Sequence, residues 1–288
     1  MRWMIVAGLS LLLGSCTAAT RETSRPAASW TPVAAPAELS APGAQWIKVD
    51  GRDGYKFLAA VLRPQGAGPF PVVVLLHGAG GLQPVHLALA DEVARAGFLV
   101  VVGCWQLVAS PPAPAPNPVC SEARPQAAWQ TAPAANSGKE LIAAARTLPG
   151  ARADRIGLFG VSRGGNAALF AASTGAGVQA VVGDAPAHLP LRVTPAPPST
   201  QDVVAGLTAP VLLLHGTADR IVPVEQSREY ERAARALGKR VTAVYFDGVG
   251  HVVTFTPGGP ESDEAAARRA AQPEARRRVI EFLREQLR

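Results

Sequence analysis

The motif Gly160-Val161-Ser162-Arg163-Gly164 constrains the fold of this chain more than any other short segment. An apolar run, 155–159, precedes it, and an alanine-rich stretch, 165–173, follows it. A strand, a serine between two glycines and a helix in that order predict a nucleophile elbow. Side chains at the two glycine positions would collide with the neighbouring strand and helix, because the turn is so sharp. The pattern predicts an exposed Ser162 hydroxyl at a helix N-terminus, although an ordinary glycine-rich turn has the same spacing.

Length and composition limit what the rest of the chain can be. Its 288 residues, 48% of them apolar and 17% charged, can form one large α/β domain with a substantial core. The net charge of +6 is scattered, and the one arginine run, Arg276-Arg277-Arg278, lies on an expected amphipathic helix. A solvated helix face explains that run, so we expect no nucleic-acid partner. Since the sequence has neither metal-ligand spacing nor a dinucleotide fingerprint, we expect no metal and no cofactor.

The first residues have the features of an export signal rather than of a fold. Arg2 supplies a positive charge, and Ile5 to Leu13 form an apolar segment that is too short to span a bilayer. The sequence Leu13-Gly14-Ser15-Cys16 resembles a bacterial lipobox, which predicts a lipid on Cys16. A plain secretory signal cut near Ala18-Ala19 is the alternative. In either case we expect a protein of the bacterial cell envelope, periplasm or exterior, with membrane contact through a lipid anchor only.

The rest of the chain divides into a tether and one domain. Residues 17–43 are rich in Ala, Pro, Ser and Thr and predict an unstructured tether between a signal peptide, 1–16, and a domain, 44–288. Strands are expected at 45–49, 56–62, 71–76, 98–102, 155–159, 178–182, 209–214 and 240–246. Helices are expected at 85–96, 137–148, 165–173, 225–237 and 273–287. The first two strands form an antiparallel pair, and the alternation from 71 onward predicts a mostly parallel, doubly wound sheet.

Three candidate catalytic residues directly follow expected strands. Ser162, Asp219 and His251 would meet beyond the carboxyl ends of the parallel strands, where such sheets gather their sites. A nucleophile, a base and an acid that orients the base are what acyl transfer needs. Asp184 also ends a strand and is an alternative acid. The other histidines, expected to support loops or to lie without partners, are His77, His86, His188 and His215.

Four motifs in this order resemble the α/β-hydrolase superfamily, above all its dienelactone hydrolase-like branch and related secreted esterases. They are His77-Gly78-Ala79-Gly80-Gly81, the elbow, His215-Gly216-Thr217-Ala218-Asp219 and Gly250-His251. The resemblance spans about 45–287 and implies an α/β-hydrolase fold. It makes Ser162 the nucleophile, His251 the base and Asp219 the acid, since this is the order of the family triad. It makes the backbone N–H groups of Ala79 and Arg163 the oxyanion hole.

The resemblance implies a serine hydrolase that cleaves a small carboxylic ester through an acyl-enzyme intermediate. Dienelactone hydrolases proper use a cysteine where this chain has Ser162, which argues against dienelactone as the substrate. Many lipases carry a large lid domain between the strands that end near 184 and begin near 209, and this chain has no room for one. A prolyl-oligopeptidase-like serine peptidase and a non-catalytic binding lipoprotein on the same fold are the alternatives.

If Cys16 carries a lipid, the two other cysteines of the chain are available for a disulfide. Cys104 and Cys120 lie in an oxidising compartment and are separated by a proline-rich segment, which predicts a disulfide, with two unpaired thiols as the alternative. The stretch 104–135 has no clear period and is expected to be one long loop. Trp105 and Trp129 would give this loop the apolar surface of a pocket wall.

Overall fold

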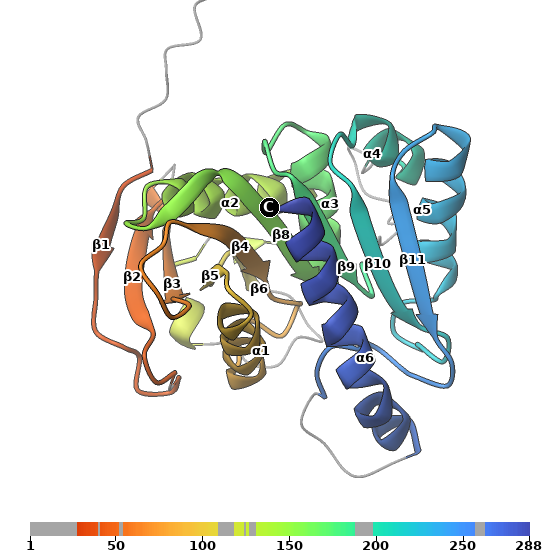
Figure 1. The fold of residues 1–288 in the computed structure, drawn as a ribbon, viewed down its shortest axis with the longest axis horizontal. Helices are drawn as coiled ribbons and strands as arrows, with labels where there is room; N and C mark the ends of the chain where they lie inside the picture. Colours follow the sequence, from red (N-terminus) through yellow and green to blue (C-terminus); the bar gives the residue numbers. More distant parts are fainter. Residues whose placement is uncertain are drawn as a thin grey trace, which may run out of the picture.

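A twisted nine-stranded sheet forms the centre of the molecule (Figure 1). The computed structural model describes residues 28–39, 41–51, 54–108, 118–123, 125–126, 131–187, 198–256 and 263–288. The strands of the sheet are β1 (Trp30–Pro32), β2 (Gln45–Asp50), β3 (Lys56–Leu62), β4 (Phe70–Leu76), β5 (Leu99–Gly103), β8 (Ala151–Val161), β9 (Ala180–Asp184), β10 (Val211–Gly216) and β11 (Val241–Phe246). Their spatial order is β1-β2-β3-β5-β4-β8-β9-β10-β11.

The pairing confirms the predicted mixture of strand directions. β1 pairs antiparallel with β2, β2 with β3, and β3 with β5. From β5 to β11 every neighbouring pair is parallel. All residues of β5, β9 and β10 are buried, as expected for parallel strands covered on both faces. The chain therefore has the predicted α/β-hydrolase fold, with a mostly parallel sheet and antiparallel N-terminal strands.

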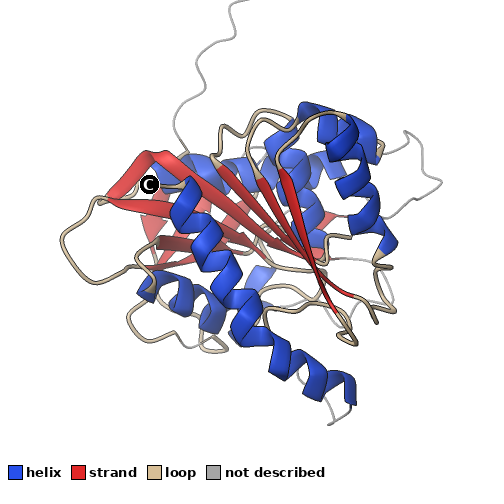
Figure 2. Ribbon diagram, turned by 45° about the vertical axis from the view of Figure 1, so that its right-hand side comes forward, coloured by secondary structure: helices blue, strands red, loops and turns tan. Residues whose placement is uncertain are grey.

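Helices cover both faces of the sheet (Figure 2). They are α1 (Pro84–Arg95), α2 (Thr131–Arg146), α3 (Arg163–Ser173), α4 (Thr200–Gly206), α5 (Glu225–Ala236) and α6 (Asp263–Gln286). α1 and α6 lie on one face, and α2, α3, α4 and α5 lie on the other (Figure 1). Among the described residues, no helix is both long and apolar enough to cross a membrane.

The sheet begins earlier in the chain than the sequence predicted. β1 lies inside the stretch 17–43 that was expected to be an unstructured tether, and its residues pair with β2. The Trp30 indole also donates a hydrogen bond of 3.0 Å to the Thr147 hydroxyl. A three-residue strand that ends at Pro32 has too little apolar pattern to be recognised without its partner strand. The predicted boundary at residue 44 is therefore wrong, and residues 1–27 lie outside the described part of the chain.

Two helices also begin earlier than predicted. α6 begins at Asp263 rather than near Pro273, which lies inside the helix. Asp263 and Glu264 in its first turn suit the positive end of the helix dipole, and Glu264 pairs with Arg268 one turn later. α2 begins at Thr131 rather than at 137, so the expected loop 104–135 is shorter. Within that stretch the structure describes a small parallel pair, β6 (Leu107–Val108) and β7 (Pro125–Gln126), and a 3-10 turn, η2 (Pro118–Cys120).

The pairing register aligns the C-terminal ends of the central parallel strands along one edge of the sheet. Leu76 at the end of β4 lies opposite Gly103 on one side and Gly160 on the other, and Val161 lies opposite Asp184. The segments that follow β4, β5, β8 and β9 therefore emerge side by side. Between β9 and β10 the described residues form only the short helix α4, so no large lid domain occurs in that described part.

Candidate active site

Ser162 lies in a strained turn between β8 and α3. Its φ of 52° and ψ of −118° are unusual for a residue with a side chain. A Cβ atom at Gly160 would overlap the Gly164 carbonyl, and one at Gly164 would overlap the Leu76 carbonyl. Both glycines of the motif are therefore required by close backbone approach, as the elbow predicts.

His251 lies within hydrogen-bond distance of the serine. Its Nε2 is 2.9 Å from Ser162 Oγ, and its Nδ1 is 2.7 Å from Asp219 Oδ2. An ionised carboxylate can only accept, so Nδ1 carries the proton that is donated to Asp219. The Nε2 lone pair is then free to accept the hydroxyl proton of Ser162. The three residues, which are far apart in the sequence, form one hydrogen-bonded chain.

Asp219 is held as an anion by several donors. Its Oδ1 accepts hydrogen bonds of 2.8 Å from the backbone N–H groups of Ile221 and Val222. Its Oδ2 accepts from His251 and also from His215 Nε2, at 3.1 Å. Burial by itself would raise the pKa of Asp219, but the hydrogen bonds from His215, His251 and Val222 together hold that pKa below its ordinary value.

His215 was expected to support a loop, and its contact with Asp219 was not predicted. Its side chain is fully buried, its Nε2 also lies 2.9 Å from the Val222 carbonyl, and its Nδ1 lies 2.7 Å from Ser227 Oγ. Both partners of Nε2 are acceptors, so Nε2 carries the proton and Nδ1 accepts from the Ser227 hydroxyl. The spacing of four residues between His215 and Asp219 was the available signal, but the contact also depends on the turn between them.

Asp184, the alternative acid, has other partners. Its carboxylate accepts hydrogen bonds from the backbone N–H of Val253 and from the N–H and hydroxyl of Thr254, at 2.6–3.1 Å. The residue is fully buried, and this burial raises its pKa. Asp219, and not Asp184, makes the hydrogen bond to the His251 ring. Between the two candidate acids, the geometry therefore favours Asp219.

The loop after β4 passes directly beside the serine. A Cβ atom added to Gly78 would lie 3.4 Å from the Ser162 Cβ, which is ordinary van der Waals contact, so the backbone of this loop lies next to the serine. The N–H of Ser162 donates to the Asp184 carbonyl at 2.8 Å and is not available to a substrate. Arg163 is the first residue of α3, so its N–H lies at the positive end of the helix dipole. The oxyanion hole formed by Ala79 and Arg163 stays a prediction, and these contacts are compatible with it.

Two further histidines lie buried behind this loop. His77 donates through Nδ1 to the Gly78 carbonyl at 2.7 Å, and burial lowers the pKa of His77 to about 3. His86 accepts through Nδ1 from the backbone N–H of Gln83 at 3.1 Å, so the prediction that it lacks a partner is wrong. Burial lowers the pKa of His86 to about 4. Both rings are therefore neutral near pH 7, and His77 supports the loop as predicted.

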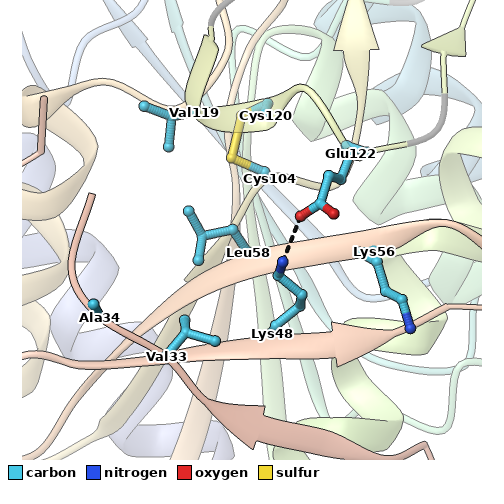
Figure 3. A pocket seen from close by; sticks show the side chains of 10 residues that line it. Val33, Ala34, Lys48, Lys56, Leu58, Cys104, Val119, Cys120 and Glu122 are labelled. Atoms are coloured by element: carbon cyan, nitrogen blue, oxygen red, sulfur yellow. Dashed lines mark ion pairs between the residues drawn. A yellow bond between two sulfur atoms is a disulfide. The ribbon is translucent and has the colours of Figure 1, made fainter. Parts of the chain in front are cut away.

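The predicted disulfide between Cys104 and Cys120 is present, with the two Cα atoms 5.2 Å apart. It borders a cavity of about 170 Å³ whose wall comes mainly from the antiparallel end of the sheet (Figure 3). Lys48 and Glu122 form an ion pair of 2.6 Å at this cavity, and its lining residues include no member of the hydrogen-bonded chain. Toward the serine, the Trp105 indole donates to the His77 carbonyl at 3.0 Å. Trp105 therefore links the disulfide segment to the loop beside Ser162.

Some predicted features lie outside the described residues. They are Cys16 with its lipid, Trp129 and His188. Within the described ranges, no cluster of three His, Cys, Asp or Glu side chains could hold a metal ion. The described residues do include a serine, a histidine and an aspartate in one hydrogen-bonded chain, and these are the residue types that acyl transfer can use.

The chain is similar to known proteins over most of its length. The model of the family described as "Dienelactone hydrolase family" matches residues 57–287. A Bradyrhizobium protein described as a "probable 2-oxo-3-(5-oxofuran-2-ylidene)propanoate lactonase" is 29% identical over 210 residues, which is 72% of this chain and 82% of that protein.

Two solved structures illustrate the likeness in fold. The dienelactone hydrolase from Anabaena variabilis has a TM-score of 0.59 and 18% identity, over 85% of this chain and all of that one. Dipeptidyl peptidase 4 from Porphyromonas gingivalis has a TM-score of 0.64 and 17% identity, over 85% of this chain but only 35% of that one. At such identities the likeness concerns the fold alone.

Proposed function

The chain belongs to the dienelactone hydrolase family, and on this premise we propose that it is a serine hydrolase that cleaves carboxylic esters. The observation that carries the proposal is the continuous hydrogen bonding from Ser162 through His251 to Asp219. A serine hydroxyl is a weak nucleophile at neutral pH unless an adjacent base removes its proton. Here the base is already in contact with the hydroxyl and is oriented by an anion.

In the proposed acylation step, Ser162 Oγ attacks the ester carbonyl while His251 Nε2 takes the hydroxyl proton. Asp219 stabilises the imidazolium that forms, because its Oδ2 accepts the Nδ1–H of the ring. The same proton is then given to the leaving alcohol, and an acyl-enzyme remains. In the second half, water attacks the acyl group with His251 again as the base, and the acid is released.

The negative charge that develops on the carbonyl oxygen needs donors that are already in place. We assign this role to the backbone N–H groups of Arg163 and Ala79. Arg163 directly follows Ser162 and is the first residue of α3, so its N–H belongs to the helix N-terminus, which favours a negative charge. Ala79 follows Gly78, whose backbone lies against Ser162.

The substrate class is proposed from chemistry and from the relatives. A lactone is a cyclic ester, so the name of the Bradyrhizobium protein, a lactonase, falls within the same reaction. Because the nucleophile here is a serine, we favour simple carboxylic esters and lactones over dienelactone itself. A peptidase is the rival function, since dipeptidyl peptidase 4 shares the fold.

A substrate panel tests this proposal. It comprises p-nitrophenyl esters of increasing acyl length, an unsubstituted γ-lactone and peptide p-nitroanilides, each given to the wild type and to Ser162→Ala. We expect the wild type to hydrolyse the esters or the lactone faster than any anilide. Ser162→Ala should lose nearly all of this activity. Faster turnover of an anilide would favour the peptidase, and turnover of none would favour a non-catalytic binding protein.

We also propose that the protein is exported and carries a lipid on Cys16. The support is the lipobox-like sequence Leu13-Gly14-Ser15-Cys16 and the disulfide, which suits an oxidising compartment. Mass spectrometry of the mature N-terminus from a bacterial host should find a diacylated Cys16. An unmodified N-terminus after residue 16 would indicate a soluble periplasmic or secreted enzyme instead.

A further inference from the structure

His251 lies in a segment that forms no regular secondary structure and contains a strained backbone conformation. Residues 251–256, the histidine loop, follow β11 without forming a helix or a strand. Val252 has a φ of 66°, in the left-handed region that branched side chains avoid. A conformation of this kind persists only when its surroundings fix it. The position of His251 therefore depends on what contacts the loop.

From the sheet side, the loop is held by Asp184. The buried carboxylate accepts from the N–H groups of Val253 and Thr254 and from the Thr254 hydroxyl. The backbone carbonyl of the same residue accepts the N–H of Ser162. Asp184 is thus in direct contact with the backbone of the proposed nucleophile and with the loop of the proposed base.

From the other side, the loop is held by α6, which crosses in front of the parallel strands (Figure 1). The Nε–H of Arg268 donates to the Val252 carbonyl at 2.9 Å, and the Nε–H of Arg276 donates to the Thr254 carbonyl at 2.7 Å. Arg268 is buried, and its charge is paired with Glu264 at 2.6 Å. The N–H groups of the loop therefore bind a carboxylate, and its carbonyls bind guanidinium groups.

We propose that Asp184 and Arg268 are positioning residues that hold His251 at hydrogen-bond distance from Ser162 and act on catalysis only through His251. This inference rests on the proposed role of His251 as the base. Both side chains are buried and bond other groups of the protein, so their removal should lower kcat and leave KM nearly unchanged. A small displacement of a catalytic group is enough for a large loss of rate.

A double-mutant cycle tests whether Arg268 acts through His251. Arg268→Gln is made in the wild type and in His251→Ala, and kcat for an activated p-nitrophenyl ester is measured in all four proteins after subtraction of the Ser162→Ala background. We expect kcat to fall about 10- to 100-fold in the wild-type background and by less than about 2-fold in His251→Ala. Arg277→Gln, on the same helix, is the matched control, because Arg277 bonds the exposed Glu274 and Glu281.

A milder variant covers the case in which Arg268→Gln does not fold. Thr254→Val removes only the hydroxyl that bonds Asp184 and keeps the side-chain shape, so it too should lower kcat with KM unchanged. Equal losses in both backgrounds, or full kcat in Arg268→Gln and Thr254→Val, would overturn the inference. If His251→Ala keeps full activity, His251 is not the base and the proposed function itself is wrong. If His251→Ala is inactive but Arg268→Gln lowers kcat equally in both backgrounds, only the positioning role of Arg268 is wrong.

Discussion

Asp219 Oδ2 accepts hydrogen bonds from two histidines at once, His251 at 2.7 Å and the fully buried His215 at 3.1 Å. One of these rings contacts Ser162, and the other is anchored by the Ser227 hydroxyl. The proposed acid is therefore held by a second histidine besides the one that contacts Ser162. We expect the orientation of its carboxylate toward His251 to depend on this buried histidine.

Replacing His215 with Ala should lower kcat by about 10- to 100-fold, because a hydrogen bond to a charged group is worth about 1.5 to 3 kcal/mol. His215→Gln can still offer an N–H to Asp219 and should lose less. Steady-state kinetics with one activated ester measures both. Ser227→Ala removes the anchor of His215 but not the ring that bonds Asp219, so it should lower kcat less than His215→Ala does. Full activity in His215→Ala would show that the two backbone donors of Asp219 suffice.

Acid should destabilise the fold through His77. Burial lowers its pKa from 6.5 to about 3, so the unfolded chain binds a proton in this range of pH while the folded protein does not. Stability should therefore fall as the pH drops from 6.5 toward 3, by about 1.4 kcal/mol per pH unit for each such group. His77→Asn can keep a donor toward the Gly78 carbonyl without a titrating ring.

Urea unfolding of the wild type and of His77→Asn at pH 7, 6, 5 and 4 measures this effect. As the pH falls, the free energy of unfolding of the wild type should decrease more than that of His77→Asn. A difference that stays constant over this range would mean that His77 takes up its proton in the folded protein as easily as in the unfolded chain.

The elbow should not tolerate a methyl group at Gly164. The Cβ atom of Gly164→Ala would overlap the Leu76 carbonyl at the end of β4, and neither backbone can move without distorting the turn. We expect loss of ester turnover and a lower melting temperature. Gly138→Ala in α2 is the control, because its Cβ meets only the flexible end of the Leu76 side chain at 3.3 Å. If Gly164→Ala is as active and as stable as Gly138→Ala, the elbow is not as tight as the structure indicates.

Breaking the disulfide should change substrate binding more than stability. Cys104→Ser with Cys120→Ser removes a crosslink worth about 3 kcal/mol on the chain-entropy model for a closed loop of this size. The Trp105 indole, next to Cys104, bonds the His77 carbonyl, so we expect a raised KM while the sheet remains folded. Steady-state kinetics of the double variant measure KM, and an unchanged KM would place the disulfide segment away from the substrate.

Thiol titration of the denatured, unreduced wild type tests whether the disulfide forms. Two reactive thiols would mean that there is no crosslink.

Much of the site could be predicted because each motif is local. The glycines around Ser162 and the strand-then-loop pattern before Asp219 and His251 are set by neighbours in the sequence, and their order fixes where they meet in a parallel sheet. Asp184 remained an open alternative to Asp219, since both end strands. Only the hydrogen bonds of the folded chain distinguish them.

The contacts that hold these residues could not be predicted from local pattern. Arg268 reaches the Val252 carbonyl from the part of α6 that precedes Pro273, where the sequence predicts no helix. β1 depends on pairing with β2, and a strand of three residues has no periodicity of its own. These features are set by tertiary contacts between segments that are distant in the chain.

The central claim is that Ser162 is the nucleophile activated by His251 and Asp219, and covalent labelling tests it most directly. The wild type, Ser162→Ala and His251→Ala are incubated with a fluorophosphonate, and the labelled peptide is identified by mass spectrometry. We expect one label on Ser162 in the wild type, much slower labelling in His251→Ala, and none in Ser162→Ala. Labelling of a different residue, or labelling that survives Ser162→Ala, would contradict the account.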